Sequence, residues 1–139
     1  MSERHPVGLL DTSTLILLPR LKDPDVLPDE ALISAVTLAE LSAGPLVAVG
    51  RERESRQAVL QQTEADFVPL AFDAEAARAF GRVAASLRRG GRKPAARAYD
   101  AMIAAIALSN ELPLYTCNPQ DFRGIDGLLV VGVPHPDHP

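Results

Sequence analysis

Four acidic residues are candidates for one shared site: Asp11, Glu40, Asp100 and Asp121. Two carboxylates about 5 Å apart repel each other by roughly 3 kcal/mol at an effective dielectric constant of 20, so such a group requires a positive partner. A hard divalent cation such as Mg²⁺ or Mn²⁺ meets that requirement, because it prefers carboxylate oxygens and water as ligands. A bound ion of this kind activates water and stabilises charge that develops on a phosphate. The four acids therefore indicate a candidate site for metal-dependent hydrolysis.

Three of these acids also have an ordinary structural interpretation. Asp11 suits the cap of a following helix, Glu40 suits an exposed helix position, and Asp121 suits a turn. Asp100 is harder to explain in this way, because it precedes the all-apolar stretch 101–108, and a carboxylate near a buried helix needs a partner. No histidine, Ser–His pair or reactive cysteine is placed for covalent catalysis.

The first acid directly follows a short apolar run. Residues 7–10 are Val-Gly-Leu-Leu, which is typical of a strand buried on both faces, and Asp11 ends that strand. Ligands of open α/β sheets bind at the carboxyl ends of strands. We therefore expect Asp11 to face the site, with Thr12 or Ser13 capping a helix that runs to about residue 21.

Strands and helices alternate along the remaining chain. Further strands are expected at residues 31–34, 67–70, 114–116 and 128–133, the second of them at a sheet edge because it contains a proline. Helices are expected at residues 36–43, 51–64, 73–89 and 94–108, with Gly-Pro or Gly-Gly ending two of them. This order predicts an α/β fold with a parallel sheet of four to five strands and helices on both faces.

The length of 139 residues fits one domain with a real core. We assign residues 1–133 to that domain and residues 134–139 to a flexible tail, in which His135 and His138 stand among prolines. The single Cys117 excludes an internal disulfide and a cysteine-based zinc cluster. A polar start and the lack of an apolar run of about 18 residues predict a cytoplasmic protein without a signal peptide or a membrane anchor.

The net charge of −4 argues mildly against a nucleic-acid partner, but the distribution of charge matters more. Residues 78–97 contain seven basic side chains and no acid. This stretch is either a solvated helix face with a basic loop or a surface that faces phosphates. The residues with a possible RNA-binding role are Arg88, Arg89, Arg92, Lys93 and Arg97.

At the four acids the sequence resembles the PIN-domain ribonucleases, and most closely the VapC toxins of type II toxin–antitoxin systems. The resemblance rests on residues 9–13, 33–41, 100–105 and 116–122, four short motifs in the right order. It implies that Asp11, Glu40, Asp100 and Asp121 are the catalytic and metal-binding acids. It also implies supporting hydrogen-bonding roles for Thr12, Ser13, Thr116 and Asn118.

One position stays open within this assignment. Asn118 leaves the same strand end as Asp121, so either side chain could take the inner place at the metal. Cys117 stands where relatives often carry a basic or polar residue and receives no role.

The resemblance further implies a Mg²⁺- or Mn²⁺-dependent endoribonuclease in which metal-bound water attacks a phosphodiester in line. The implied substrate is structured RNA, such as transfer or ribosomal RNA. The implied partners are a second copy of the chain, as a homodimer, and a small cognate VapB-like antitoxin whose tail enters the acidic site.

Two other classes of function stay open. A haloacid dehalogenase-like phosphotransferase also begins with a strand ending in Asp, but it needs a second acid where Ser13 stands and a late lysine, whereas the only lysines are Lys22 and Lys93. A domain that only binds an antitoxin or RNA is the non-enzymatic alternative. The presence of all four acids argues against it.

Overall fold

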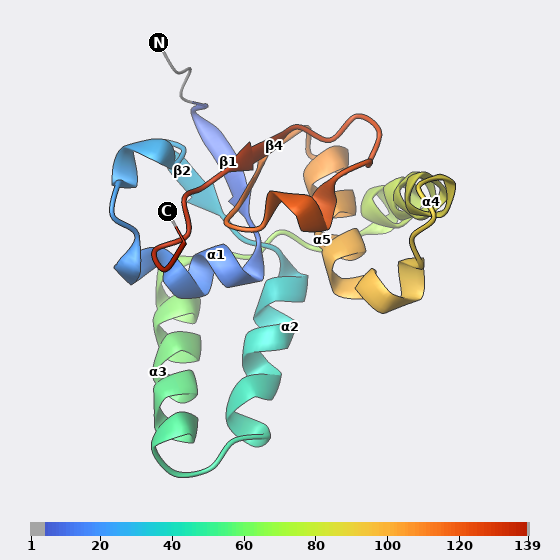
Figure 1. Cartoon of the computed structure of the whole chain (residues 1–139). Coiled ribbons are helices and arrows are strands. Elements are labelled where there is room, and N and C mark those ends of the chain that lie inside the picture. Colours follow the sequence, from blue (N-terminus) through green and yellow to red (C-terminus); the bar gives the residue numbers. More distant parts are fainter. Residues whose placement is uncertain (1–4, 139) are drawn as a thin grey trace.

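The structure, a computed structural model, describes residues 5–138 and is built on a four-stranded parallel sheet (Figure 1). The strand order is β2-β1-β3-β4, so the first strand of the chain pairs with β3 in the centre of the sheet. The strands are β1 (Val7–Leu10), β2 (Glu30–Leu32), β3 (Leu114–Thr116) and β4 (Val130–Gly132). The predicted fold class, a parallel sheet of four to five strands, is confirmed.

Strand β1 is buried on both faces, as its apolar sequence predicts. Leu9 and Leu10 are completely buried and belong to different core clusters, since successive side chains of a strand point to opposite faces. Position 8 requires glycine, because a Cβ there would lie 2.5 Å from Cε1 of Tyr115 in the neighbouring strand and would clash with it. Helices α4 (Ala74–Arg89) and α5 (Ala98–Ser109) cover the Leu9 face, and α1 (Thr12–Leu17) covers the Leu10 face.

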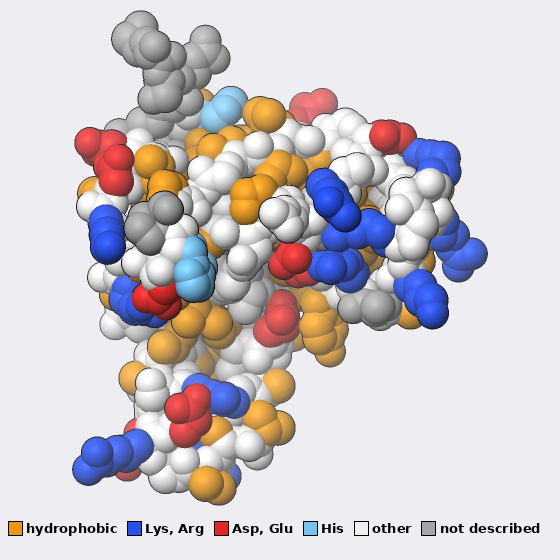
Figure 2. Space-filling model, in the orientation of Figure 1, with side chains coloured by type: hydrophobic (Ala, Val, Ile, Leu, Met, Phe, Trp, Pro, Cys, Tyr) orange, Lys and Arg blue, Asp and Glu red, His pale blue; other side chains and the backbone are white. Residues whose placement is uncertain are grey.

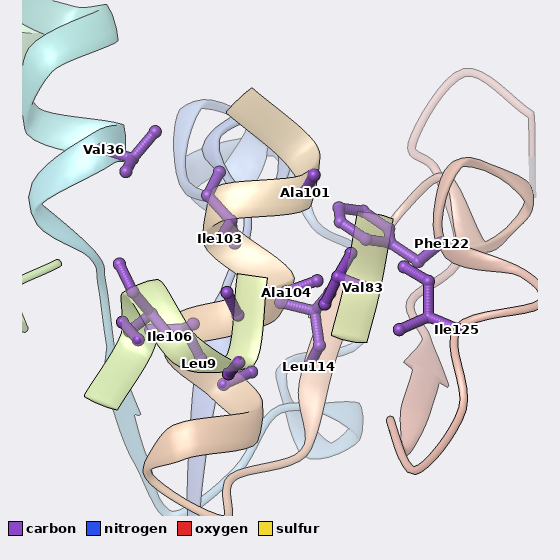
Figure 3. Close-up of a cluster of buried hydrophobic side chains, with 14 of the residues drawn as sticks. Leu9, Val36, Val83, Ala101, Ile103, Ala104, Ile106, Leu114, Phe122 and Ile125 are labelled. Atoms are coloured by element: carbon purple, nitrogen blue, oxygen red, sulfur yellow. The ribbon is translucent and has the colours of Figure 1, made fainter. Parts of the chain in front are cut away.

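The larger core lies between the sheet and α5 (Figure 3). Residues 103–107 of α5 are buried on every side, and Ala76, Ala79 and Val83 of α4 pack in the same cluster. Small side chains allow the two helices to approach closely, and Asp73 caps α4 by accepting a hydrogen bond from the amide of Ala76. The prediction of a buried helix after Asp100 is confirmed.

Helices α2 (Ala35–Ala43) and α3 (Gly50–Asp66) form a hairpin that projects from the body of the molecule (Figure 1). The base of the hairpin packs through a small cluster containing Leu15, Ile33 and Leu41. Its bend is held by Arg53, whose Nε donates to the carbonyls of Pro45 and Ala48. Both helices were expected from the sequence, and the hairpin sets Glu40 of α2 near the sheet.

Several predicted elements differ from the structure. Helix α5 begins at Ala98 after a 3₁₀ turn (Pro94–Arg97), and the last strand is shorter than residues 128–133. Residues 67–70 form no strand, and only an isolated bridge joins Leu70 to Ser34, with Leu70 donating to Ile33 at 2.9 Å. The first helix ends at Leu17 rather than near residue 21, because Pro19 cannot continue the α-helical ladder and a 3₁₀ turn (Leu18–Arg20) follows. The second strand ends at Leu32, since Ser34 already caps α2.

The end of the described chain is ordered around β4. Val133 is buried and donates to the carbonyl of Thr116, and Asp137 pairs with Arg20. The assignment of residues 1–133 to the domain and of residues 134–139 to a flexible tail stays a prediction. Residues 1–4 and 139 lie outside the described residues. None of the helices within residues 5–138 combines the length and apolar character needed to cross a bilayer.

Candidate active site

Asp11 occupies the carboxyl end of β1 and is only 4% exposed. Its Oδ1 accepts a hydrogen bond from the amide of Thr14, which makes Asp11 the N-cap of α1. The expectation that Thr12 or Ser13 takes over this cap is therefore wrong. A carboxylate has two oxygens, so Asp11 caps the helix with one and presents the other to neighbouring hydroxyls.

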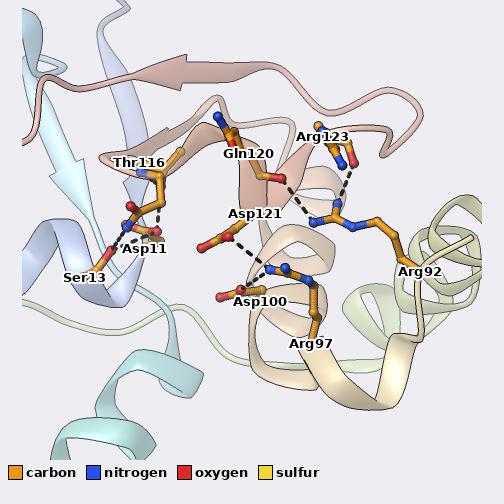
Figure 4. Close-up of polar contacts among 10 residues, drawn as sticks. Asp11, Ser13, Arg92, Arg97, Asp100, Thr116, Gln120, Asp121 and Arg123 are labelled. Atoms are coloured by element: carbon orange, nitrogen blue, oxygen red, sulfur yellow. Dashed lines mark hydrogen bonds and ion pairs between the residues drawn. The ribbon is translucent and has the colours of Figure 1, made fainter. Parts of the chain in front are cut away.

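Thr116, at the end of β3, is the main support of Asp11. Its hydroxyl donates to Oδ2 of Asp11 at 2.7 Å and accepts from the amide of Asn118 at 2.9 Å. Ser13 donates to the same carboxylate at 3.3 Å, and the side-chain amide of Asn118 donates to Ser13 at 3.2 Å. Figure 4 shows Ser13 and Thr116 beside Asp11, and Asn118 joins this group through its hydrogen bonds to both.

Glu40 approaches the same end of the sheet from α2. Thr12, the fourth expected supporting residue, donates to Oε1 of Glu40 at 2.7 Å and lies 2.9 Å from the hydroxyl of Thr37. Ser34 donates to Thr37 at 3.4 Å. This chain of hydroxyls orients Glu40 and leaves its other oxygen available.

Asp100 and Asp121 form the second pair of acids, and a cation lies between them. Asp100 is in the first turn of α5 and Asp121 in a 3₁₀ turn (Pro119–Phe122) after β3. Arg97 Nη1 donates to Asp121 at 3.1 Å and lies 4.0 Å from Asp100 Oδ2. The side chain of Asp100 is 35% exposed, so the partner expected for it exists, but the carboxylate opens toward solvent.

The other three acids act electrostatically on Asp100. The pKa of Asp100 is raised from 3.8 to about 6, first by burial and then by the charges of Asp121, Asp11 and Glu40. Arg97 opposes this shift and does not cancel it. An additional positive charge at this end of the sheet would therefore stabilise the ionised acids.

The donor set fits a hard divalent cation. All candidate ligands are carboxylate, hydroxyl or amide oxygens, and Mg²⁺ takes one or two carboxylates and keeps several waters. Within residues 5–138, however, no three Asp, Glu, His or Cys side chains converge closely enough to hold an ion by themselves. The acids stand as two separate groups, with Asp11 and Glu40 held by hydroxyls and the other pair bridged by Arg97.

The basic residues of the stretch 78–97 divide by what they contact. Arg92 donates to the carbonyls of Arg123 and Gln120, and its pKa is lowered first by burial and then by nearby Arg97 and Arg123. Arg89 pairs with Asp126, and Arg88 and Lys93 are exposed. Figure 2 shows basic side chains gathered around α4 and the segment after it, next to a small acidic area.

Two cavities adjoin the acids. One of about 540 Å³ is lined by Glu40, Asp100, Arg97 and Tyr99, together with two alanines. The other, of about 420 Å³, lies between α1, α2 and α3, with apolar walls from Ile16, Leu41 and Val59 as well as polar residues. The sequence gives no signal for Tyr99 at this cavity or for the contacts of Arg97 with Asp100 and Asp121, and the possible RNA-binding role of Arg97 stays a prediction.

Comparison with known proteins gives a consistent result. The PIN domain family profile matches residues 9–128. Ribonuclease VapC5 of Mycobacterium tuberculosis is 35% identical over 135 residues, covering 96% of this chain and 98% of the relative. The crystal structure of VapBC-5, a member of the VapBC family of toxin–antitoxin systems from the same organism, matches with a TM-score of 0.79 at 36% identity, covering 92% of this chain and 99% of that one. The structure of DNA-bound VapBC from Salmonella typhimurium matches with a TM-score of 0.71 at 29% identity, covering 91% and 96%.

Proposed function

The chain belongs to the PIN-domain family and, within it, to the VapC ribonucleases, and from this membership we propose that it is a metal-dependent endoribonuclease acting as the toxin of a toxin–antitoxin pair. Membership of this family excludes the haloacid dehalogenase-like phosphotransferase alternative. The observation that supports catalysis most directly is that Asp100 shares a cavity with Glu40 and has its pKa raised, first by burial and then by the charges of three acids from separate parts of the chain. Such a group of carboxylates favours binding of a divalent cation. Without the cation it would repel RNA phosphates, which argues against a domain that only binds RNA.

We assign Asp11, Glu40, Asp100 and Asp121 as the residues that would hold Mg²⁺ or Mn²⁺. When bound, the ion supplies an acidified water for in-line attack on a phosphodiester and neutralises charge on the phosphate. Thr116 and Ser13 fix the orientation of the Asp11 carboxylate by donating hydrogen bonds to it. Thr12 does the same for Glu40.

Of the two side chains that could take the inner place at the metal, we propose Asp121 rather than Asn118. The side-chain amide of Asn118 donates to Ser13, which gives it a positioning role beside Asp11. Asp121 carries a charge and lies in the group bridged by Arg97. Arg97 is the cation that the chain itself supplies, and it is the side chain best placed to meet an RNA phosphate next to Asp100.

A VapB-like antitoxin is the proposed inhibitor. The cavity between α1, α2 and α3 offers apolar walls at Ile16, Leu41 and Val59, and Glu40 also lines it. An antitoxin tail with apolar residues and one basic residue matches these walls and this charge. We include a homodimer in the proposal, on the resemblance to the family, and place the protein in the cytoplasm with its RNA. Light scattering on purified protein decides between one and two copies.

The decisive experiment is digestion of defined structured RNA with added Mg²⁺ or Mn²⁺ and with excess chelator. We expect cleavage only with metal, and we expect an Asp100→Asn variant with an intact circular dichroism spectrum to be inactive. Cleavage that persists in excess chelator contradicts the proposal. RNA binding without cleavage under all metal conditions instead supports the binding-domain alternative.

A further inference from the structure

Tyr99 is an aromatic residue exposed beside the acidic site. It lies in the first turn of α5, directly before Asp100, and it is 59% exposed. The next turns of α5 are almost entirely buried, with Ala101 and residues 103–107 in the core. Among the described residues, the aromatic rings that contact one another are those of other side chains, and Tyr99 takes part in none of these contacts. The folded chain therefore leaves this ring available to a ligand.

The cavity at Tyr99 has walls of the kind that a nucleotide requires. Its volume of about 540 Å³ falls in the range of small-molecule sites, which runs from roughly 300 to 1,000 Å³. Tyr99 contributes an aromatic ring, Arg97 a positive charge, and Asp100 and Glu40 the acids proposed to act on the phosphate. Base, phosphate and reacting centre could thus be contacted within one recess.

We propose that Tyr99 is a stacking platform for the base of the nucleotide next to the scissile phosphate. This inference rests on the proposed ribonuclease function and names a residue that contacts its substrate. An aromatic side chain stacks on any base, because every base has a π face, and this contact requires a base that is not already stacked in a helix. Tyr99 therefore selects for unpaired nucleotides rather than for one base.

Arg97 orients the RNA backbone relative to the base that stacks on Tyr99. It lies two residues before Tyr99 and lines the same cavity, so a base on the ring and a phosphate on the guanidinium place the backbone beside Asp100. In a continuous A-form duplex each base is covered on both faces by its neighbours, so a duplex cannot offer the base to Tyr99 without unstacking. Single-stranded loops meet this requirement without that cost.

The test is binding of a short single-stranded RNA that carries 2-aminopurine, a base whose fluorescence falls on stacking, in excess chelator so that metal-dependent cleavage does not occur. We expect quenching with the wild-type protein, no quenching with Tyr99→Leu, and affinity lower by about 5- to 150-fold, the effect of losing one base–aromatic stack. Tyr99→Phe should retain both quenching and affinity. Leu129→Ala, at another exposed apolar position, is the matched control and should behave as wild type.

A second arm repeats the titration with the same sequence as a duplex. Tyr99→Leu should leave duplex binding unchanged, and with metal it should raise the KM for single-stranded RNA. Wild-type protein that does not quench, a Tyr99→Leu variant that binds single strands normally, or an equal loss for single and double strands overturns the inference. These outcomes are separate from failure of the proposed function, which is the absence of metal-dependent cleavage by the wild-type protein.

Discussion

Arg97 donates a hydrogen bond to Asp121 at 3.1 Å and so places a guanidinium between two carboxylates that sequence alone suggests for a metal ion. The same nitrogen is 4.0 Å from Asp100. Arg97 and a divalent cation would therefore act on the same carboxylates. In the chain by itself, this arginine provides part of the positive charge that the acids require.

Replacing Arg97 by Gln should make the protein less stable without metal and more responsive to it. The ion pair is partly exposed and contributes about 0.2–1 kcal/mol, which is a fall in Tm of roughly 1–4 °C for a chain of this size. Mg²⁺ or Mn²⁺ should then raise the Tm of the variant more than that of the wild type, because the carboxylates have no internal cation. Thermal unfolding over a metal titration measures this.

Arg78→Gln is the matched control for that titration. Arg78 pairs with Glu75 on the surface of α4, so its loss should leave the response to metal unchanged. An Arg97→Gln variant with a wild-type metal response would show that the guanidinium does not compete at this site.

Asp100→Asn should stabilise the metal-free protein at neutral pH and not at acidic pH. The folded pKa of about 6 lies above the ordinary 3.8, so the folded state binds the proton more tightly and stability falls as pH rises from about 4 to 6. Above that range the whole cost is present. For a side chain 35% exposed we expect about 1 kcal/mol, after allowance for solvent screening.

Urea unfolding at about pH 4 and pH 7.5 checks this sign. The gain should appear at pH 7.5 and vanish at pH 4. Asp126→Asn, which removes an exposed partner of Arg89, should give no gain at either pH. A gain for Asp100→Asn that is the same at both values would rule out the electrostatic origin.

Thr116→Val should weaken both the fold and the metal response. The hydroxyl is buried, donates to Asp11 and accepts from the amide of Asn118, so its loss leaves the buried Asp11 carboxylate and the partly buried amide less well satisfied, at a cost of about 1–3 kcal/mol. The variant should also gain less stability from added Mn²⁺, because Asp11 loses its strongest support. As a control, Thr63→Val removes a buried hydroxyl whose hydrogen bond, to the carbonyl of Val59, stays within α3. It should lower stability and leave the gain from Mn²⁺ unchanged, and an equal loss of that gain in both variants would contradict the role of Thr116.

Neutralising the exposed arginines of α4 should reduce the salt dependence of RNA binding. For Arg88→Gln with Arg89→Gln, the slope of log K against log salt should fall by about 0.7 for each phosphate of a single-stranded RNA that the protein no longer neutralises. Lys22→Gln with Arg51→Gln removes the same charge from exposed positions elsewhere. Equal effects of the two double variants would indicate general charge rather than an RNA-facing surface. Arg92 is left out because its hydrogen bonds to two carbonyls also hold the turn at Gln120.

The sequence was sufficient for the framework of the site. An apolar run that ends on Asp11 identifies a buried strand, and an all-apolar helix makes Asp100 conspicuous, because both signals depend on local pattern. The fold class follows from the alternation of elements. Short segments such as residues 67–70 were misassigned, since four residues with strand composition do not determine whether a partner edge is available.

The sequence was insufficient for contacts between distant segments. Arg97 belongs to a basic stretch and is read as a surface cation until the turn that carries Asp121 is placed against it. Tyr99 precedes a buried helix and carries no signal that its ring points outward. The double use of Asp11, as helix cap and as acceptor from Thr116, depends on a strand 105 residues further along the chain.

That separation of 105 residues has a consequence for synthesis of the protein on the ribosome. Strand β1 emerges before its central neighbour β3 and before the turn with Asp121. A nascent chain that has not yet released residues 114–121 lacks both the hydroxyl that holds Asp11 and one of the four acids. The proposed site therefore cannot assemble before the ribosome has released the chain through residue 121.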